Sequence, residues 1–431
     1  MRTRILATLG PATTTETAIR ALVDAGVDAF RLNFSHGTHA EHGASIATIR
    51  RVAGARPVAI VQDLAGPKLR LTRPVKGNPG DVVEIALPAS VRPGDPVLLA
   101  DGMAQLQVID AGHARVVVGG EVPAGKGINL PSSRLDDVPA LTAKDRDDLR
   151  FGVSQGVDWV ALSFVRRASD LDEVRASGIP TIAKFEKAQA VEHMAEIVDA
   201  ADAVMVARGD LGVEIPIERV PIVQKELITA ANRAAKPVIT ATQMLRSMVE
   251  SVLPTRAEAT DVANAVLDGT DVVMLSEETA IGRHPVEAVG VMRRILGEAE
   301  RILTPRTGAV ATDVASMLAG AACEMAARIG AHAIVVPTRS GTTARRVASH
   351  RPPVPILALT PDEDVRRRLS LAWGVVACPS PRFGDAATVF TQYGDVVRAT
   401  GLVPAGRQVV FTGSWPFGGP GPTNLVHVMT I

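Results

Sequence analysis

Short apolar runs alternate with amphipathic helical patterns along roughly the first 303 residues. The runs are rich in Val and Ile and nearly continuous, which indicates strands buried on both faces, as in a parallel sheet. Eight such strands are predicted, at residues 4–10, 27–35, 57–64, 157–164, 180–186, 202–210, 237–244 and 271–278. Eight strands, each followed by a helix, predict a (β/α)8 barrel.

Helix start and stop signals fill the intervals between these strands. Residues 13–15 are threonines that can cap the start of a helix ending near Gly26. Thr142, with Asp145 three residues later, has the spacing of a capping box, and residues 255–267 read as a helix that ends at a glycine. These signals support the alternation of strand and helix that a barrel requires.

Two parts of the chain break this alternation. The first, about residues 66–139, is rich in Pro, Gly and Val and has short alternating runs, which predicts a small β domain inserted after the third barrel strand. The other restarts the pattern with helix 311–329 and strands at 332–337, 356–359 and 375–378, which predicts a separate three-layer α/β domain. The predicted division is 1–65 and 140–303 for the barrel, 66–139 for the insert and 304–431 for the last domain.

Composition narrows the possible functions. Lys and Arg total 46, as do Asp and Glu, so the formal net charge is zero, which argues against broad binding of nucleic acid or an anionic membrane surface. No apolar run reaches the roughly 18 residues of a membrane span, so we expect no membrane-spanning segment. The two cysteines, Cys323 and Cys378, are far apart, which excludes a disulfide framework or a cysteine zinc site and fits a reducing cytosol.

Polar side chains gather at the C-terminal ends of the predicted strands, where barrel active sites are built. Six strands contribute them: Arg31, Asn33, Ser35 and the following His36; Asp63; Lys184 and Glu186; Arg208, Gly209 and Asp210; Thr242; Ser276 and Glu278. Any one of these alone is more often a cap or a surface ion pair. Glu186 and Asp210, on adjacent strands, are typical of a Mg²⁺ site, and Lys184 beside them requires an anion. The pattern predicts a Mg²⁺-bound anionic substrate that carries phosphate.

Several motifs resemble those of the pyruvate kinase family, in order and spacing, over nearly the whole chain. They are TLGPA at 8–12, RLNFSHG at 31–37, KGINLP at 126–131, ARGDLGVE at 207–214, ATQM at 241–244 and PTRAE at 254–258. The resemblance implies a (β/α)8 TIM barrel, an inserted small β-barrel lid domain and a C-terminal α/β regulatory domain. It also implies the last step of glycolysis, in which phosphoenolpyruvate and ADP give pyruvate and ATP.

The resemblance implies a role for each motif residue. Glu186 and Asp210 hold Mg²⁺ or Mn²⁺, Lys184 neutralises charge on the phosphoryl group, and Arg31 clamps phosphate. The substrate-binding set is Arg31, Lys184, Gly209, Asp210, Thr242 and Ser276, and Thr242 also helps to protonate the enolate. The nucleotide-binding set is Asn33, His36, Arg70 and Lys126, of which the last lies in the lid.

The sequence departs from the commonest family pattern after the third strand. Members that K⁺ activates usually have Asp-Thr-Lys-Gly-Pro-Glu there, whereas this chain has DLAGPK at 63–68. The resemblance therefore implies the K⁺-independent branch, in which the tethered ammonium of Lys68 replaces K⁺ beside Asn33, Ser35, Asp63 and Leu64. The alternative is that Lys68 is a solvated lysine at the lid hinge.

Two further departures concern single positions. Glu277 stands where the family usually has glycine, and Arg246 stands where Glu is common. Neither removes a catalytic group, and the sequence does not show what they change.

The last domain carries a loop suited to phosphate. Thr338, Ser340, Gly341, Thr342 and Thr343 follow a predicted strand and open a helix. In the family this loop binds an effector, which here could be fructose 1,6-bisphosphate, another sugar phosphate or AMP. The alternative is simple helix capping. The resemblance further implies a cytoplasmic homotetramer.

Two rival functions stay open at this point. One is a Mg²⁺-dependent barrel lyase acting on a 2-oxo acid, against which the lid and Lys126 argue. The other is a non-catalytic relative that senses a phosphometabolite, against which Lys184, Glu186, Asp210 and Thr242 argue.

Overall fold

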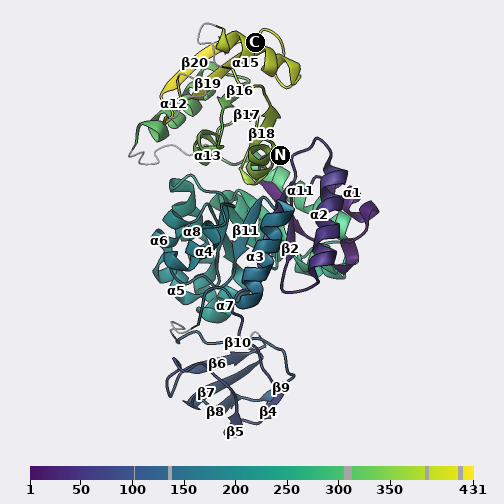
Figure 1. Cartoon of the computed structure of the whole chain (residues 1–431), viewed down its shortest axis with the longest axis vertical. Coiled ribbons are helices and arrows are strands. Elements are labelled where there is room, and N and C mark those ends of the chain that lie inside the picture. The colour runs from purple at the N-terminus through teal and green to yellow at the C-terminus, as the bar shows by residue number, and fades with distance from the viewer. Residues whose placement is uncertain (101, 134–137, 305–312, 384–387, 416–420) are drawn as a thin grey trace.

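The computed structural model describes residues 1–431 except 101, 134–137, 305–312, 384–387 and 416–420. Figure 1 shows three parts in a row: a barrel in the middle, the inserted β unit at one end of it and the C-terminal α/β unit at the other. The insert therefore lies far from the C-terminal unit, with the barrel between them.

Eight parallel strands close into a barrel in the order β1-β15-β14-β13-β12-β11-β3-β2. All eight predicted strands are confirmed, and nearly every residue in them is buried. Their bounds are β1 Arg4–Thr8, β2 Ala29–Asn33, β3 Ala59–Leu64, β11 Trp159–Leu162, β12 Thr181–Phe185, β13 Ala203–Ala207, β14 Val238–Ala241 and β15 Val272–Leu275.

Helices surround these strands, and their ends follow the predicted signals. Thr142 caps α3 by accepting from the Asp145 N–H, while the Asp145 carboxylate accepts from the Thr142 N–H at 2.8 Å. The α-helices are α1 Glu16–Ala25, α2 His39–Ala53, α3 Ala143–Gln155, α4 Asp172–Arg175, α5 Ala188–Glu192, α6 Met194–Ala200, α7 Arg208–Glu214, α8 Val220–Arg233, α9 Arg256–Asp268, α10 Glu277–Ala280 and α11 Pro285–Arg301. Four 3₁₀ turns join them: η1 Pro11–Thr13, η2 Ala168–Leu171, η3 Ile217–Arg219 and η4 Arg246–Val249.

All the predicted barrel strands except the third extend one to three residues too far at their C-terminal ends. β13 ends at Ala207, so Asp210 lies in the first turn of α7, and β15 ends at Leu275, so Glu278 lies in α10. β2 ends at Asn33, and Ser35 follows it in a turn. The strands stop where the buried apolar run stops, and the polar residues beyond belong to the turns and helices that form the rim.

The inserted unit is antiparallel. β10, β6, β7, β8 and β5 form one sheet in that order, and β4 pairs with β9 in a two-stranded ribbon. Alternate residues of β7 are buried, and their side chains form a small apolar core of their own. The bounds are β4 Val75–Gly77, β5 Val82–Glu84, β6 Pro96–Leu99, β7 Ala104–Asp110, β8 His113–Val118, β9 Gly120–Val122 and β10 Ile128–Asn129.

The C-terminal unit has a five-stranded sheet in the order β18-β17-β16-β19-β20, with β20 antiparallel to β19. The three predicted strands are confirmed as β16 Ala333–Pro337, β17 Ile356–Thr360 and β18 Val375–Pro379, and the sheet adds β19 Gln408–Gly413 and β20 Leu425–Thr430. The helices are α12 Val314–Ile329, α13 Thr342–Ser349, α14 Glu363–Arg368 and α15 Val389–Ala399, with η5 Leu369–Leu371. Residues 311–312 of the predicted first helix lie outside the described residues.

The C-terminal unit meets the barrel where the parallel strands begin, opposite the insert (Figure 1). Leu371 belongs to the buried cluster that fills the barrel interior, together with Leu6 and Trp159. Arg351, which is 2% exposed, donates to the carboxylate of Asp271 at the start of β15. This end of the barrel is thus closed by side chains of another part of the chain.

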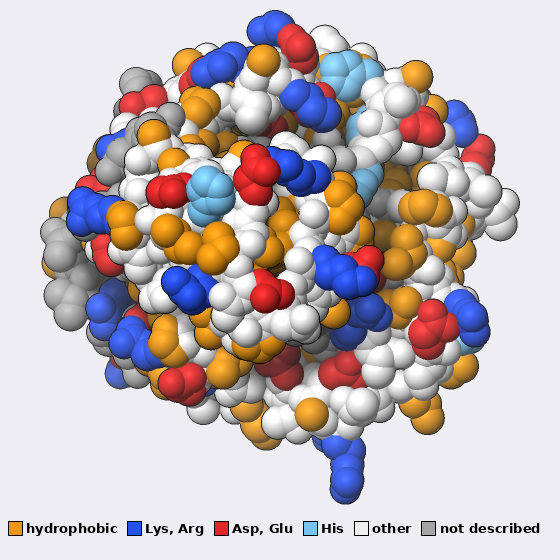
Figure 2. Space-filling model, turned by 90° about the horizontal axis from the view of Figure 1, so that it is seen from below, with side chains coloured by type: hydrophobic (Ala, Val, Ile, Leu, Met, Phe, Trp, Pro, Cys, Tyr) orange, Lys and Arg blue, Asp and Glu red, His pale blue; other side chains and the backbone are white. Residues whose placement is uncertain are grey.

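The surface carries mixed charge. Seen from the insert end, Figure 2 shows basic and acidic side chains interspersed, with neither sign gathered in one large patch. Among the described residues, no helix combines the length and apolar character needed to cross a membrane.

Candidate active site

A buried charge cluster lies at the C-terminal ends of β2, β3 and β12. Lys184 Nζ is 3.2 Å from Asp63 Oδ1 and 2.9 Å from Glu186 Oε1. Arg31 Nε is 2.5 Å from the other oxygen of Asp63. The register pairs Arg31 with Val61, two residues before Asp63 on β3, so the Arg31 and Asp63 side chains point to the same face of the sheet and can meet. Two cations and two carboxylates predicted from separate strands are therefore in direct contact.

The buried groups shift each other's acidity. Burial by itself lowers the pKa of Lys184, but the carboxylates of Asp63 and Glu186 outweigh it and raise that pKa above its usual value. Burial likewise raises the pKa of Asp63, yet Lys184 and Arg31 outweigh it and the net shift is downward. Lys184 is thus held protonated and Asp63 ionised by each other's charge.

Glu186 behaves differently from Asp63. Burial raises its pKa, Lys184 opposes that shift, and the nearby carboxylate of Asp210 adds to the rise. Two carboxylates that repel each other at a partly enclosed site are stabilised by a cation between them. The donor chemistry therefore fits a divalent metal ion.

The fit to Mg²⁺ rests on a small set of protein ligands. No group of three or more His, Cys, Asp or Glu side chains suited to a metal occurs in the described part of the chain. Magnesium usually takes one or two carboxylates and completes its shell with water and substrate oxygens. Glu186 and Asp210 form a carboxylate pair that could serve as these ligands.

Lys68 forms an ion pair with Asp210 in this structure. Its Nζ is 3.0 Å from Asp210 Oδ1, and both side chains are about a quarter exposed, at 28% and 25%. The sequence predicts Lys68 beside Asn33, Ser35, Asp63 and Leu64 instead. Among the described residues, no hydrogen bond or ion pair joins Lys68 to those four. Asp63 instead contacts Arg31 and Lys184.

Thr242 stands at a strained turn after β14. Its φ is +72° and that of Gln243 is +56°, and a β-branched residue with positive φ is an outlier. The Thr242 hydroxyl accepts from the Gly209 N–H at 2.7 Å and donates to the Ala241 carbonyl at 2.6 Å. Arg208 donates to the Thr242 carbonyl at 2.7 Å. The turn is therefore fixed against the start of α7, and the Gly209 N–H is used by Thr242.

Ser276 and its neighbours form the end of β15. Glu278 accepts from the Ser276 N–H at 2.7 Å and from the Leu245 N–H at 3.0 Å, which ties this end to the loop after β14. The Ser276 hydroxyl is buried and has no hydrogen-bond partner among the described residues. Arg246 Nε and Glu277 Oε2, the two departures from the family pattern, lie 2.6 Å apart.

Comparison with known proteins decides the family. The model of the pyruvate kinase barrel domain matches residues 1–87 and 78–289, and that of the pyruvate kinase α/β domain matches residues 316–429. Pyruvate kinase 2 of Synechocystis is 44% identical, covering 100% of this chain and 79% of that protein. A pyruvate kinase of Agrobacterium vitis is also 44% identical, with 99% and 98% covered. The chain belongs to the pyruvate kinase family.

Structural comparison agrees. A crystal structure of a pyruvate kinase from Cryptosporidium parvum matches with a TM-score of 0.91 at 33% identity, covering 100% of this chain and 96% of that one. The predicted family and fold class are confirmed, and the chain is an enzyme, a transferase of the pyruvate kinase type. The two rival functions are therefore set aside.

The residues that the pyruvate kinase resemblance assigns to nucleotide lie in two groups. Arg70 pairs with Gly127 through a backbone bridge, and the Leu71 N–H donates to the Lys126 carbonyl, so the exposed residues Arg70 and Lys126 lie on two paired segments of the insert. Asn33 and His36 lie on the barrel, where the Asn33 side chain accepts from the Ser35 N–H at 3.2 Å. Within the described residues, no hydrogen bond joins the two groups.

Sequence reasoning missed several residues of the site. Ser163 accepts a hydrogen bond from Lys184 Nζ at 2.7 Å, and the Phe164 N–H donates to Glu186 Oε2, also at 2.7 Å. Both follow β11, one of the two strands from which no polar group was predicted. Their position just past a buried apolar run is the signal that could have found them, since the other site residues share it.

The predicted effector loop lies beside a pocket of about 920 Å³ in the C-terminal unit. Thr338, Ser340, Thr342 and Thr343 line it, and Gly341, with φ +79°, is the N-cap residue just before α13. The Thr338 hydroxyl accepts from the Gly341 N–H at 2.9 Å, which fixes the turn before α13, whereas the N-cap of α13 itself makes no side-chain cap. Arg346 and Arg382 add positive charge to the wall.

Proposed function

We propose that this enzyme transfers the phosphoryl group of phosphoenolpyruvate to ADP, giving pyruvate and ATP as the last step of glycolysis, with Mg²⁺ or Mn²⁺ bound and without a need for K⁺. The observation that carries the proposal is the buried ammonium of Lys184, held protonated between Asp63 and Glu186. A cation fixed at the mouth of a barrel can stabilise a phosphoryl group during transfer, where positioning and charge supply most of the catalysis.

The chain's residues divide the chemistry among them. Lys184 and Arg31 bind the phosphoryl oxygens and neutralise their charge as the bond to the enolate oxygen breaks. Glu186 and Asp210 hold the divalent ion, which when bound draws negative charge from the substrate carboxylate and phosphoryl group. Thr242, through water, helps to deliver the proton that turns the enolate into pyruvate.

The substrate is oriented by the neighbouring strand ends. The start of α7, at Gly209 and Asp210, and the Ser276 hydroxyl face the carboxylate of phosphoenolpyruvate. The unpartnered Ser276 hydroxyl supports this, because a buried hydroxyl gains stability from a hydrogen-bond partner.

The nucleotide binds between the barrel and the insert in this proposal. Asn33 and His36 contact ADP from the barrel, and Arg70 and Lys126 contact it from the insert, whose closure brings the two groups together and excludes water. The exposure of Arg70 and Lys126 supports this, because neither side chain forms an ion pair with the described residues of the barrel. We accordingly divide the chain into the barrel at 1–65 and 140–303, the lid at 66–139 and the regulatory domain at 304–431.

Lys68 replaces the monovalent cation in this proposal. Its ammonium is tethered at the mouth, next to Asp210, so it can supply a single positive charge near the substrate without a bound K⁺. Asn33, Ser35, Asp63 and Leu64 would form the pocket that K⁺ uses in other members.

Regulation and assembly complete the proposal. The 920 Å³ pocket is large enough for a sugar phosphate or AMP, and its hydroxyls and arginines suit phosphate. Thr338, Ser340, Gly341, Thr342 and Thr343 would hold that phosphate. We further propose a cytoplasmic homotetramer, as the family resemblance implies.

A coupled assay tests the proposal. Pyruvate release is followed through lactate dehydrogenase with phosphoenolpyruvate, ADP and Mg²⁺, in K⁺-free buffer and with added K⁺. We expect turnover in both buffers, and a loss of at least about 10²-fold for Lys184→Met, whose ammonium is gone. The matched control Lys225→Met removes an exposed lysine paired with Asp268 and should retain activity. No turnover under any candidate effector would reject the function, and a strict need for K⁺ would reject the role of Lys68.

A further inference from the structure

We propose that Phe164 is a positioning residue that aims the metal-binding carboxylate of Glu186. The proposal rests on the proposed function, because it takes Glu186 as a ligand of the divalent ion. It concerns a residue that no motif of the sequence singled out, and it starts from the backbone rather than from the side chain.

The backbone of Phe164 is in an unusual conformation. Its φ is +58°, in the left-handed region where a bulky residue is uncommon and costs free energy. Such conformations persist where the surrounding structure enforces them, and they cluster at functional sites. Here the conformation turns the Phe164 N–H onto Glu186 Oε2 at 2.7 Å, between two buried residues.

The hydrogen bond from the Phe164 N–H sets which lone pairs of the Glu186 carboxylate are free to bind a metal ion. Oε2 accepts from the Phe164 N–H, and Oε1 lies 2.9 Å from Lys184 Nζ. With both oxygens fixed, the carboxylate cannot rotate freely, and its remaining lone pairs point in a defined direction. Groups that orient a metal ligand in this way commonly change metal affinity when they are altered.

The ring of Phe164 explains why the strained backbone persists. The side chain is 8% exposed and packs against Gly66, at the start of the insert. A Cβ on Gly66 would lie 3.1 Å from Phe164 Cδ2 and 3.0 Å from the Ser163 carbonyl, and Gly66 itself has φ +67°. The backbone at Gly66 therefore lies closer to the Phe164 ring than a residue with a side chain would allow.

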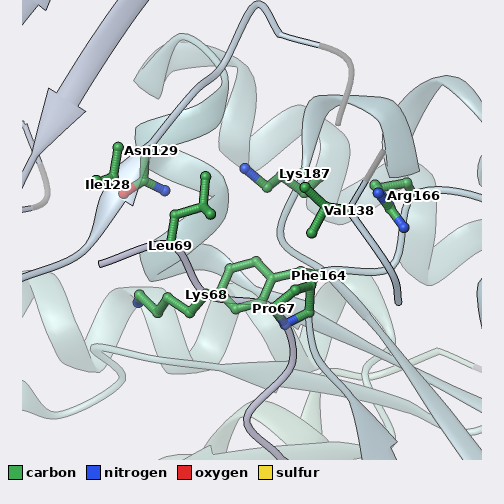
Figure 3. Close-up of a pocket in the computed structure, with 9 residues that line it drawn as sticks. All are labelled: Pro67, Lys68, Leu69, Ile128, Asn129, Val138, Phe164, Arg166 and Lys187. Carbon is green, nitrogen blue, oxygen red and sulfur yellow. The ribbon is translucent and has the colours of Figure 1, made fainter. Parts of the chain in front are cut away.

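Two ammonium groups also border the ring. Lys68 Nζ lies 5.7 Å and Lys187 Nζ 6.0 Å from the ring centroid, at the limit of a cation–π contact. Lys68 also contacts Asp210, and Lys187 contacts Glu214 at 2.6 Å. Figure 3 shows Phe164 beside Pro67 and Lys68, with Lys187 reaching over the same small pocket. Phe164 thus touches Glu186 directly and reaches the other carboxylate, Asp210, through Lys68.

A plain packing role makes a different prediction from a positioning role. If Phe164 only fills space, its loss should lower stability and leave metal affinity unchanged. If it aims Glu186, metal affinity should depend on how readily residue 164 adopts positive φ. Glycine does so easily, alanine less easily and β-branched valine least.

The experiment measures binding of Mn²⁺ alone to the substrate-free full chain by electron paramagnetic resonance. Phe164→Gly and Phe164→Ala both lack the ring and differ by one methyl group. We expect Phe164→Gly to bind Mn²⁺ about 5–30-fold more tightly than Phe164→Ala, because the left-handed backbone costs alanine more. We expect Phe164→Val to bind about 10–100-fold more weakly than the wild type. Equal affinity of the Gly and Ala variants, or weaker binding by Gly, would overturn the proposal.

Two controls separate the possible failures. Phe30→Val removes a buried barrel aromatic with ordinary strand backbone, so it should lower stability without changing Mn²⁺ affinity. Glu186→Gln should weaken Mn²⁺ binding. If Glu186→Gln has no effect, the proposed metal site is wrong; if it weakens binding while the Phe164 series does not follow the order above, the positioning role is wrong. The Gly and Ala pair decides the matter even if Phe164→Val does not fold.

Discussion

Replacing Arg351 by methionine should release the C-terminal unit from the barrel. Arg351 follows α13, and its guanidinium donates to Asp271 Oδ1 at 2.8 Å, to Asn232 Oδ1 at 2.8 Å and to the Gly269 carbonyl at 2.6 Å. All three partners belong to the barrel, and the guanidinium also lies 5.0 Å from the centre of the Trp373 ring. One side chain therefore makes several buried polar contacts across the junction.

The size of the effect follows from burial. Arg351 is 2% and Asp271 4% exposed, so removing the guanidinium leaves a carboxylate that water cannot reach. Breaking a buried ion pair from one side typically costs about 3–5 kcal/mol. Asp271 keeps the Val238 N–H as a donor at 2.9 Å, which places Arg351→Met toward the lower part of that range. The added Asp271→Asn change should recover part of the loss, because it removes the unpaired charge.

Urea unfolding followed by tryptophan fluorescence tests this, since Trp373 lies beside Arg351. We expect the free energy of unfolding to fall by about 3 kcal/mol or more, with the C-terminal unit unfolding before the barrel. The control Arg328→Met breaks an exposed pair with Glu324 and should cost under about 1 kcal/mol. A loss for Arg351→Met no larger than that of the control would refute the reasoning.

Three more predictions concern single sites. Lys68→Glu should make activity depend on added K⁺ in the coupled assay. A variant that is as active without K⁺ as with it would contradict the proposal that Lys68 replaces the monovalent cation. Burial raises the pKa of Cys323 to about 12 and also raises the pKa of Cys378, so a thiol reagent near neutral pH should modify neither until the protein is denatured; rapid native reaction counts against this. A double-mutant cycle on Arg246 and Glu277, both half exposed, should give about 0.2–1 kcal/mol that high salt abolishes, and zero coupling at low salt excludes the pair.

The barrel was predictable because its signal is strong at every strand. Each strand is a short, mostly apolar run with polar residues at or just past its end, and helix caps such as Thr142 and Thr255 are encoded locally. The strand ends were less predictable, since apolar periodicity does not show whether a polar residue such as Asp210 continues a strand or begins a helix. Strand β20 was missed for a related reason: its residues are only partly buried, so it lacks a continuous apolar run.

The sequence predicted which residues gather at the rim better than it predicted the contacts they make there. Spacing and resemblance brought Lys184, Glu186 and Asp210 to one rim, yet neither could reveal that Phe164 adopts positive φ, because that conformation is set by tertiary packing. Likewise the sequence marked Arg246 and Glu277 as separate departures. Only the fold shows that they form an ion pair between the start of η4 and the start of α10.

The balance of positive and negative charge that gives the whole chain a net charge of zero is also found at the candidate active site. Arg31 and Lys184 are matched by Asp63 and Glu186, and Lys68 is matched by Asp210, so each cation at the mouth already has a carboxylate partner. Binding an anionic substrate alone would add unbalanced negative charge beside these carboxylates, and binding a divalent ion alone would add unbalanced positive charge beside the ammonium groups. Entering together, the two compensate each other, so a neutral protein can hold highly charged metabolites without a basic surface. The interspersed surface charge in Figure 2 and the paired charges at the mouth therefore follow one rule: in both places positive charge is balanced by nearby carboxylates.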